Sequence, residues 1–321
     1  MKLIIQIPCL NEEKSLPVTL ADLPKKIEGV DSIETLVIDD GSTDRTVEVA
    51  RAHGVDHVLS LTNNKGLAKA FMHGINYALE QKADIIVNTD ADNQYYGGDI
   101  ASLIQPIVQG RADIVVGDRQ VETIKHFSPL KIFLQKFGSW VVRQVSGTDI
   151  PDTTSGFRAY SKEAALQLNV VSDFTYTIET IISAGKKNLA ITHVPIRTNP
   201  KLRESRLFPS IRAYIQRTVI TIIKIYSMYK PLKVFSLVGG VSFAAGLIIG
   251  CRYLYFFLQG STAGHIQSLI LSAILLIVGF QIIMMGIMAE LIAINRQLLE
   301  DIQLRVKKSD LRKDNPSKAR R

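Results

Sequence analysis

Cysteine is scarce in this sequence, whose 321 residues include only Cys9 and Cys251. Cys9 lies at the end of the first predicted strand and Cys251 in an apolar segment, so we do not expect the two thiols to pair. This excludes a disulfide-stabilised scaffold and fits a reducing compartment. Residues 1–3 lead directly into a short strand pattern that ends at Pro8 and Asn11, and this apolar run is too short for a signal peptide. We therefore expect the N-terminal domain to stay in the cytosol.

The first 200 residues lack an excess of basic side chains, with 20 Lys and Arg against 24 Asp and Glu, although the whole chain has a net charge of +8. The excess is concentrated in residues 201–233, with eight basic residues against one acidic, and in residues 296–321, with nine against four. A nucleic-acid-binding protein would spread its basic residues over its folded domain. These segments flank an apolar region, so the sequence predicts membrane lipids as a partner and no nucleic acid.

Charged residues are almost absent from two long apolar runs. Residues 234–258 contain only Arg252, and residues 266–289 contain no charged side chain. Because about 20 apolar residues span the hydrocarbon core of a bilayer, we predict two transmembrane helices, at about 234–258 and 266–290, within a membrane region of residues 232–295. The alternative, two buried helices of a soluble domain, would need a larger core than this chain can provide.

The loop between the two runs, residues 259–265, has no Lys or Arg, whereas the segments on either side of the pair are basic. Positive-inside counting therefore places both termini, including a basic tail at 296–321, in the cytosol, as in a multi-pass protein of a cell inner membrane or its equivalent. Arg252 and Glu290 lie near the ends of their spans, which favours anchoring over a transport pathway.

Strand and helix patterns alternate along the first 120 residues. Five short apolar runs are predicted as strands, at residues 3–7, 35–38, 58–61, 85–87 and 114–116. Segments with helical spacing are predicted at residues 12–23 (with Asn11 as N-cap), 47–53, 65–81 and 100–108. Continuous apolar strands are typical of a parallel sheet covered on both faces. The sequence therefore predicts an α/β fold, with a ligand site beyond the carboxyl ends of the strands.

The pattern after this region is less regular. Helices are predicted at residues 130–145 and 176–186 and a strand at residues 190–195, with a polar loop at 149–160. We take residues 1–209 as one cytosolic domain. Residues 210–231 are predicted as a basic amphipathic helix lying in the membrane interface, with an ordinary surface helix as the alternative.

Asp90 and Asp92 follow the fourth predicted strand, in the stretch 89–95 (TDADNQY). Two carboxylates at a strand end can face one small volume. They are hard oxygen ligands that suit Mg²⁺ or Mn²⁺ sharing its coordination shell with a diphosphate. Asp-x-Asp alone is also common in loops, where it only solvates a turn, so the interpretation depends on the motifs that accompany it.

Four motifs in order resemble those of the family 2 glycosyltransferases, which have the Rossmann-like GT-A fold. They are residues 6–13 (QIPCLNEE), 37–44 (VIDDGSTD), 64–66 (NKG) and 89–94 (TDADNQ). Within the family they resemble the polyprenyl-phosphate sugar synthases, which include dolichyl-phosphate mannose synthase and the bacterial undecaprenyl-phosphate glucosyltransferases. The resemblance covers about residues 1–210, and the two-helix C-terminal anchor is similar to that of the bacterial type.

The resemblance implies a nucleotide-sugar site and a metal site for Mg²⁺ or Mn²⁺. The implied metal ligands are Asp90, Asp92 and Gln94. The implied donor-binding residues are Pro8, Leu10, Glu12, Ile38, Asp40, Lys65, Gly66, Asp90, Ala91, Asp92, Arg119 and Arg203. The implied catalytic residues are Asp90, Asp92, Arg119, Glu179 and Arg206, with Arg206 in a basic loop that closes over the donor.

Several of these residues have plainer interpretations. Asp39 and Asp40 could be solvated turn residues, and Arg119 could form a surface ion pair with Asp118. The stretch 152–158 (DTTSGFR) either lines the sugar and acceptor site or forms a structural turn. The basic loop could be a linker that touches only lipid head groups.

Glu179 lies in a helix where many family members carry a catalytic base. A phosphate acceptor is already an anion at neutral pH, so Glu179 could instead only orient groups. The sequence lacks the Gln-x-x-Arg-Trp motif, because no arginine precedes Trp140, the single tryptophan. This absence departs from the processive polysaccharide synthases and favours a single transfer.

We therefore predict a metal-dependent, inverting transfer of one sugar from a UDP- or GDP-sugar to a polyprenyl phosphate at the cytosolic membrane face. A homo-oligomer is compatible with the sequence. Two alternatives stay open: a membrane glycosyltransferase acting on another lipid or glycan acceptor, and a non-catalytic membrane module that only binds nucleotide sugar. The retained Asp90, Asp92, Arg119 and Arg206 favour an enzyme.

Overall fold

The computed structural model describes residues 1–120, 129–170, 176–200, 220, 231–260 and 266–313. The chain forms two compact units, of which one is Met1–Ile215 with Leu304–Arg321 and the other is Gln216–Gln303. The first unit contains a β-sheet covered by helices, and the second contains long apolar helices.

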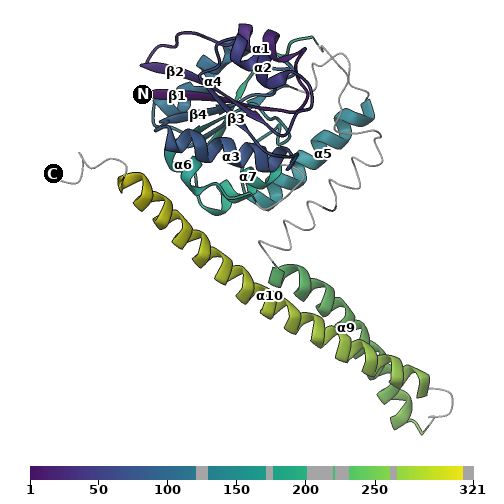
Figure 1. The fold of residues 1–321 in the computed structure, drawn as a ribbon. Coiled ribbons are helices and arrows are strands. Elements are labelled where there is room, and N and C mark those ends of the chain that lie inside the picture. The colour runs from purple at the N-terminus through teal and green to yellow at the C-terminus, as the bar shows by residue number, and fades with distance from the viewer. Residues whose placement is uncertain (121–128, 171–175, 201–219, 221–230, 261–265, 314–321) are drawn as a thin grey trace. The chain divides into compact units, whose positions relative to one another are not determined.

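A β-sheet forms the centre of the first unit (Figure 1). It has seven strands in the order β3-β2-β1-β4-β6-β5-β7. The strands are β1 Lys2–Cys9, β2 Ser32–Asp39, β3 His57–Ser60, β4 Ile85–Asn88, β5 Ile114–Asp118, β6 Arg158–Ser161 and β7 Ile191–Pro195. Neighbouring strands pair in parallel except at β6, which runs antiparallel to both β4 and β5. The predicted α/β fold with a mostly parallel sheet is confirmed.

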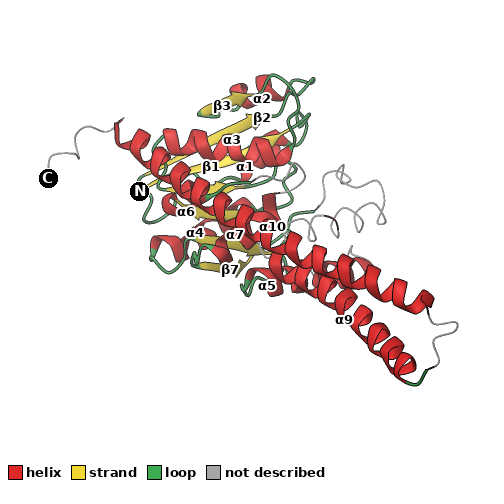
Figure 2. Cartoon of the chain, turned by 90° about the horizontal axis from the view of Figure 1, so that it is seen from below, coloured by secondary structure: helices red, strands yellow, loops and turns green. Residues whose placement is uncertain are grey.

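Helices cover both faces of the sheet (Figure 2). In the first unit they are α1 Leu16–Asp22, α2 Thr46–Ala52, α3 Leu67–Glu80, α4 Ile100–Val108, α5 Pro129–Ser146, α6 Lys162–Gln167 and α7 Tyr176–Lys186, and a 3₁₀ turn, η1 Gly97–Asp99, precedes α4. Side chains along a strand alternate between the two faces. In β1, Ile4 belongs to the core that includes Phe71 of α3, whereas Ile5 belongs to the core that includes Ile104 of α4.

The register of β1 brings the ends of several strands to one edge. Cys9 pairs with Asp39 of β2, and Gln6 pairs with Asn88, the last residue of β4. The segments that follow these strands therefore begin at the same carboxyl edge of the sheet. This edge is where the polar motifs were expected.

Two of the expected local structures are wrong. The helix expected from residue 12 begins only at Leu16, because the chain first turns at Asn11, whose φ is +56°. The polar loop expected at residues 149–160 contains the start of β6. This strand was missed because Arg158 and Ser161 interrupt its apolar pattern.

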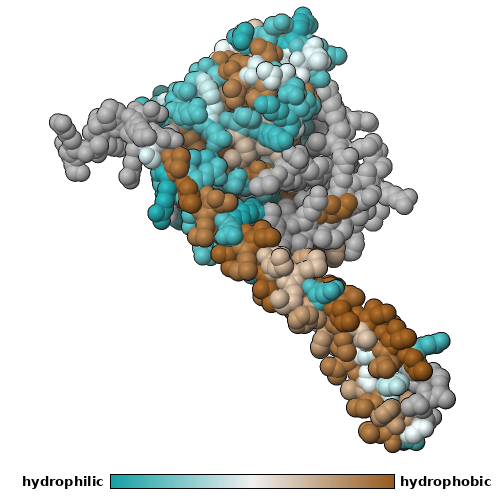
Figure 3. Space-filling model, turned by 60° about the horizontal axis from the view of Figure 1, so that its bottom comes forward, coloured by the Kyte–Doolittle hydropathy of each residue, from teal (hydrophilic) through white to brown (hydrophobic). Residues whose placement is uncertain are grey.

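The second unit contains α9, Pro231–Leu258, and most of α10, Ile266–Lys313. Both helices are long and apolar enough to cross a membrane. Apolar side chains cover much of their visible surface (Figure 3). α10 continues past residue 290, the expected end of the second span, to Lys313.

Small residues let α9 and α10 approach closely. A Cβ on Gly239 would lie only 2.7 Å from the carbonyl oxygen of Gly279. The Ser272 hydroxyl donates across the helix pair to the carbonyl oxygen of Gly246, at 2.7 Å. The backbone N–H of Leu232, at the start of α9, donates to the Glu290 carboxylate at 3.3 Å. Glu290 therefore satisfies an otherwise free N-terminal donor of α9.

The predicted interfacial helix at residues 210–231 lies outside the described residues, apart from residues 220 and 231. The end of α10 belongs to the first unit. There Leu304 packs against the core that includes α3, and Lys307 Nζ donates to Asn76 Oδ1 at 3.2 Å. The segment expected to be a basic tail is therefore helical as far as Lys313.

Candidate active site

The segments that follow β1 and β2 are tied together at the carboxyl edge. The backbone N–H groups of Asn11 and Glu12 donate to Ser42 Oγ at 2.9 Å and to Thr46 Oγ1 at 2.8 Å. In return, Asn11 Oδ1 accepts from the backbone N–H of Thr43 at 2.8 Å. These reciprocal bonds fix the two segments against each other.

Asp40, directly after β2, holds the segment that follows β3. Its two carboxylate oxygens accept from the backbone N–H groups of Lys65 and Gly66, at 2.8 and 2.9 Å. Gly66 has a φ of +91°, which favours glycine and lets the chain turn toward the carboxylate. Asp39 accepts from the backbone N–H of Ser42 at 3.0 Å. Asp39 and Asp40 are each only 4% exposed, so the interpretation as solvated turn residues is wrong.

Asp90 and Asp92 lie in a turn directly after β4. Thr19 Oγ1 of α1 donates to the carbonyl oxygen of Ala91 at 3.0 Å, and the backbone N–H of Gln94 donates to Asp92 Oδ1 at 3.1 Å. Ala91 is buried in the core, while Asp90, Asp92 and Gln94 are partly exposed. The turn therefore presents both carboxylates at the edge and anchors itself through the residue between them.

The carboxylates of this turn repel each other. Burial of the carboxyl group, reinforced by the negative charge of Asp92, raises the pKa of the Asp90 carboxyl to about 7, against the opposing effects of the Arg119 charge and of the Tyr95 hydroxyl. A cation bound by both carboxylates would remove the repulsion. The donor chemistry of this pair therefore fits a divalent cation.

Two carboxylates are enough for a site that shares its cation with a substrate. Among residues that the structure describes, no three or more His, Cys, Asp or Glu side chains converge on a metal-sized site. Mg²⁺ is commonly bound by one or two carboxylates, with water and substrate phosphates completing its shell. Asp90 and Asp92 provide two such carboxylates, and Gln94 follows them in the same turn.

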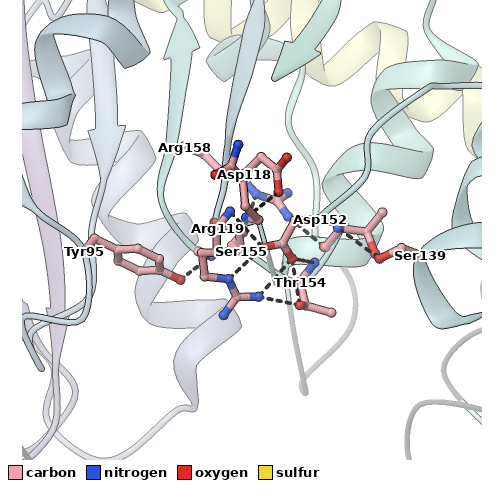
Figure 4. A network of polar contacts seen from close by, with 11 residues as sticks. Tyr95, Asp118, Arg119, Ser139, Asp152, Thr154, Ser155 and Arg158 are labelled. Carbon is pink, nitrogen blue, oxygen red and sulfur yellow. Dashed lines mark hydrogen bonds and ion pairs between the residues drawn. The ribbon is translucent and has the colours of Figure 1, made fainter. Parts of the chain in front are cut away.

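Arg119, directly after β5, forms a buried ion pair (Figure 4). Its Nε and Nη2 donate to the two carboxylate oxygens of Asp152, at 2.6 and 2.9 Å, and Nη2 also donates to Thr154 Oγ1 at 2.7 Å. Arg119 is 9% exposed and Asp152 2%. The alternative of a surface pair with Asp118 is wrong: Asp118 Oδ1 accepts from a nearby backbone N–H, that of Gln120, at 2.9 Å.

The turn between Asp152 and β6 is held by a second buried arginine. Arg158 is fully buried and donates to the carbonyl oxygens of Thr153 and Ser155, at 2.9 and 2.8 Å. Its Nη1 donates to the Thr177 carbonyl oxygen of α7, at 2.7 Å. Arg158 therefore fastens this turn to the helix that carries Glu179, whose side chain is also buried.

The segment just before the predicted basic loop pairs with the residues that follow Asp92. Thr198 forms an isolated β-bridge with Tyr95. The backbone N–H of Asn199 donates to the carbonyl oxygen of Gln94 at 2.9 Å. Asn199 therefore lies beside the turn that carries the Asp90 and Asp92 carboxylates.

The structure divides the predicted donor-binding residues into two groups. Exposed or partly exposed positions at the edge are Leu10, Lys65, Gly66, Asp90 and Asp92, and buried positions are Pro8, Glu12, Ile38, Asp40, Ala91 and Arg119. The Ile38 side chain packs in the core with α3, and its role in donor binding stays a prediction. Arg203 and Arg206 lie outside the described residues and stay predictions.

Sequence reasoning missed two features of this site. Asp152 was included only as part of a motif, and nothing in its local pattern identified Arg119 as its partner. Tyr95 was visible only as the end of the stretch 89–95, yet its hydroxyl accepts from the backbone N–H of Gly156 at 2.9 Å. The residue spacing within one motif could not reveal either contact, because each contact joins two segments that are far apart in the sequence.

Two protein-family models match the chain. Residues 4–168 match the model described as Glycosyl transferase family 2, and residues 230–294 match the model described as GtrB C-terminal hairpin. The second match covers α9 and the adjoining part of α10.

Curated proteins from archaea and bacteria are similar to this chain. An uncharacterized protein of Methanocaldococcus jannaschii is 35% identical, over 61% of this chain and 81% of that protein. The undecaprenyl-phosphate mannosyltransferase of Micrococcus luteus is 28% identical, over 64% of this chain and 88% of its own length. The glycosyltransferase AglJ of Haloferax volcanii is 27% identical, over 93% of this chain and 96% of its own.

Among solved structures, the fold is similar to glucosyl-3-phosphoglycerate synthase from Mycobacterium tuberculosis, crystallised with Mn²⁺, uridine diphosphate and glucosyl-3-phosphoglycerate. The TM-score is 0.56 at 19% identity, over 70% of this chain and 80% of that chain. At this identity the likeness shows a shared fold.

Proposed function

Because the chain belongs to glycosyl transferase family 2, we propose that it transfers one sugar, with inversion, from a UDP- or GDP-sugar to a polyprenyl phosphate at the cytosolic face of a membrane. The observation that carries the proposal is the Asp90/Asp92 pair at the carboxyl end of β4. A lipid acceptor is supported by the name of the Micrococcus luteus relative and by the hairpin match at residues 230–294.

Asp90 and Asp92 would hold Mg²⁺ or Mn²⁺, with Gln94 as a further ligand. When bound, the cation supplies Lewis-acid neutralisation of the charge on the leaving diphosphate. Asp40 orients the segment of Lys65 and Gly66 at the edge where the nucleotide would lie.

Arg119 is proposed to contact a phosphate or the sugar. The bidentate bond to Asp152 holds its guanidinium in one orientation, so little side-chain freedom is lost when a substrate binds. A polyprenyl phosphate is already ionised at neutral pH and needs no strong base. The buried Glu179 would then orient groups through α7 rather than abstract a proton.

The acceptor would reach the site from the bilayer. Two helices are long and apolar enough to span it. Residues 201–233, which precede them, carry eight basic residues against one acidic. Basic segments next to a span attract anionic head groups, at about 1 kcal/mol per Lys or Arg near the surface.

Transfer of radiolabelled sugar into lipid tests this function directly. Membranes containing the chain are incubated with UDP- and GDP-sugars and polyprenyl phosphate, with diacylglycerol and soluble glycans as competing acceptors. We expect Asp92→Asn and excess chelator each to lower the rate by about 10²-fold or more. Asp149→Asn is the matched control, because the Asp149 side chain is 98% exposed. Full activity in chelator, or transfer only to the competing acceptors, would contradict the proposal.

A further inference from the structure

A short segment after β7, residues 197–199, pairs antiparallel with residues 94–96, and we call it the strap. At one end of the strap, the backbone N–H of Asn199 donates to the carbonyl oxygen of Gln94 at 2.9 Å. At the other end, the strap accepts a second main-chain bond from the backbone N–H of Tyr96, at 3.3 Å. Two main-chain hydrogen bonds therefore join the strap to the turn that carries Asp92.

The first residue of the strap is anchored to the start of α4. Arg197 Nε and Nη2 donate to Asp99 Oδ1 at 3.0 and 2.5 Å, and the Arg197 backbone N–H donates to Asp99 Oδ2 at 2.6 Å. The guanidinium also lies over the Tyr96 ring, 4.1 Å from its centroid. Asp99 is 7% exposed, so this end of the strap is fixed to a buried carboxylate.

The last residue of the strap joins the turn to the end of α1. Asn199 Nδ2 donates to Asp22 Oδ2 at 3.2 Å and to the carbonyl oxygen of Tyr95 at 3.4 Å. The same Asp22 oxygen accepts from the backbone N–H of Gly97 at 2.8 Å. The Asn199 side chain therefore holds the second half of the turn against α1.

The contacts of the strap reach the Asp92 carboxylate through one residue. The Gln94 carbonyl oxygen accepts from Asn199, and the Gln94 backbone N–H donates to Asp92 Oδ1 at 3.1 Å. Gln94 thus uses one main-chain group on the strap and the other on the carboxylate. Because the strap fixes Gln94, it also fixes the N–H group that orients Asp92.

We propose that Asn199 is a positioning residue that holds the Asp92 carboxylate, through Gln94, in the orientation required to bind the divalent cation. A carboxylate that accepts a bond from a fixed donor turns less freely about its Cβ–Cγ bond, and its second oxygen stays available to a metal. Outer hydrogen-bond partners typically change metal affinity about 10- to 100-fold. The inference rests on the metal site proposed above, and adds that the strap after β7 fixes that site from outside the turn.

Mn²⁺ binding to the full chain in detergent tests this role without any measurement of transfer. Free Mn²⁺ is followed by electron paramagnetic resonance, with and without added UDP or GDP. Asn199→Ala removes the two side-chain bonds and keeps the backbone N–H, and we expect it to raise the Mn²⁺ dissociation constant about 10-fold. Asn199→Pro also removes the N–H that donates to Gln94, so we expect a larger loss, up to about 100-fold.

Thr198→Pro is the matched control for the proline variant. Thr198 is exposed and faces Tyr95 in the isolated bridge, between the two main-chain bonds of the strap. The N–H of a residue in such a non-hydrogen-bonded pair does not point at the opposite segment. Proline at this position therefore keeps both bonds to the turn, and we expect the Mn²⁺ dissociation constant to change less than about twofold.

A core variant separates a positioning role from a general loss of stability. Ile75→Val trims a fully buried side chain of α3, in the core on the opposite face of the sheet from Tyr95. We expect it to lower the midpoint of thermal unfolding and to leave Mn²⁺ affinity unchanged. Thermal unfolding of every variant also shows whether it is folded at the assay temperature.

The outcomes separate the inference from the function on which it rests. A wild-type chain that binds no Mn²⁺, with or without nucleotide, overturns the metal site and the inference with it. Wild-type affinity in both Asn199 variants overturns the inference alone and leaves the metal site intact. Equal losses in Asn199→Ala and Ile75→Val would assign the effect to stability and overturn the positioning role. Equal losses in Asn199→Pro and Thr198→Pro would overturn the role of the Asn199 N–H.

Discussion

Arg119 and Asp152 form a buried pair of opposite charges at the carboxyl edge. Asp152 receives two guanidinium bonds, and its Oδ1 also accepts from the Thr154 hydroxyl at 3.1 Å. Replacing such a pair with apolar side chains is often neutral, but removing one partner leaves a buried charge without compensation. The pair therefore specifies the position of Arg119 more than it adds to stability.

Asp152→Asn is expected to destabilise the first unit by about 3–5 kcal/mol, because the buried Arg119 would lose its counter-charge. Urea unfolding of the full chain in detergent, followed by near-UV circular dichroism, measures the change. Asp118→Asn is the control and should stay within about 0.5 kcal/mol, since Asp118 is partly exposed and lies outside the pair. Equal unfolding midpoints for the two variants would contradict this role of the pair.

The same pair predicts how stability depends on pH. Burial acts to raise the pKa of Asp152, but the charge of Arg119 and the hydrogen bonds from Arg119 and Thr154 outweigh burial and lower it. A carboxyl whose folded pKa is depressed contributes stability above its unfolded pKa, near about 4. This contribution is lost as the pH falls through the lower, folded pKa. The difference between wild type and Asp152→Asn should therefore shrink below about pH 4 and stay constant above about pH 5.

At the scale of elements, α9 and α10 pair through their backbones at small residues. Gly239 faces α10, whereas a Cβ on its neighbour Gly240 would meet nothing within 4 Å. Without a hydrophobic driving force between helices in lipid, close packing of small residues is a main source of association. A methyl group on Gly239 would therefore clash with α10, whereas a methyl group on the adjacent Gly240 would not.

Gly239→Ala is expected to push the helices apart, because its Cβ would lie 2.7 Å from the Gly279 carbonyl oxygen. Overpacking of this kind costs about 1–3 kcal/mol. Gly240→Ala should be neutral or stabilising by up to about 1 kcal/mol, since alanine is the better helix former. Thermal unfolding of the full chain in micelles, followed by far-UV circular dichroism, compares them. A lower midpoint for Gly240→Ala than for Gly239→Ala would refute this description of the interface.

At the scale of the whole molecule, the two helices that could cross a membrane predict an orientation for the rest of the chain. The distribution of Lys and Arg predicts both termini on the cytosolic side and the connection between α9 and α10 on the other. The two native cysteines suit a labelling experiment. Burial raises the pKa of the Cys9 thiol well above its ordinary value, so Cys9 should not react, and the exposed Cys251 can be replaced by serine.

In a Cys251→Ser background, Gln259→Cys should react with a membrane-impermeant maleimide added to intact cells. Lys14→Cys, an exposed position of the first unit, should react only after the cells are permeabilised. Gel-shift labelling measures both. Reaction of Lys14→Cys in intact cells, with Gln259→Cys protected, would reverse the predicted orientation.

Features that depend on neighbours in the sequence could be derived from the sequence alone. The apolar runs identified β1, β4 and β5, and helical spacing identified α4 and α7 with their observed bounds. Charge-free runs identified the two long apolar helices. The position of Asp90 and Asp92 at the end of β4 followed from the same local pattern. These features are determined by short-range periodicity and by the length of each run, so one sequence is sufficient to predict them.

Only the tertiary structure decided which distant segments meet. Arg119 and Asp152 are 33 residues apart, and Tyr95 and Gly156 are 61 apart. Both contacts depend on β6 entering the sheet between β4 and β5 in the antiparallel direction. That placement brings the turn at 152–157 to the edge where Asp90 lies. The position of β6 in the sheet depends on the burial of side chains from several segments at once, including the fully buried Arg158 and Phe157. The hydrophobic periodicity of a single segment therefore cannot predict where that segment lies in the sheet.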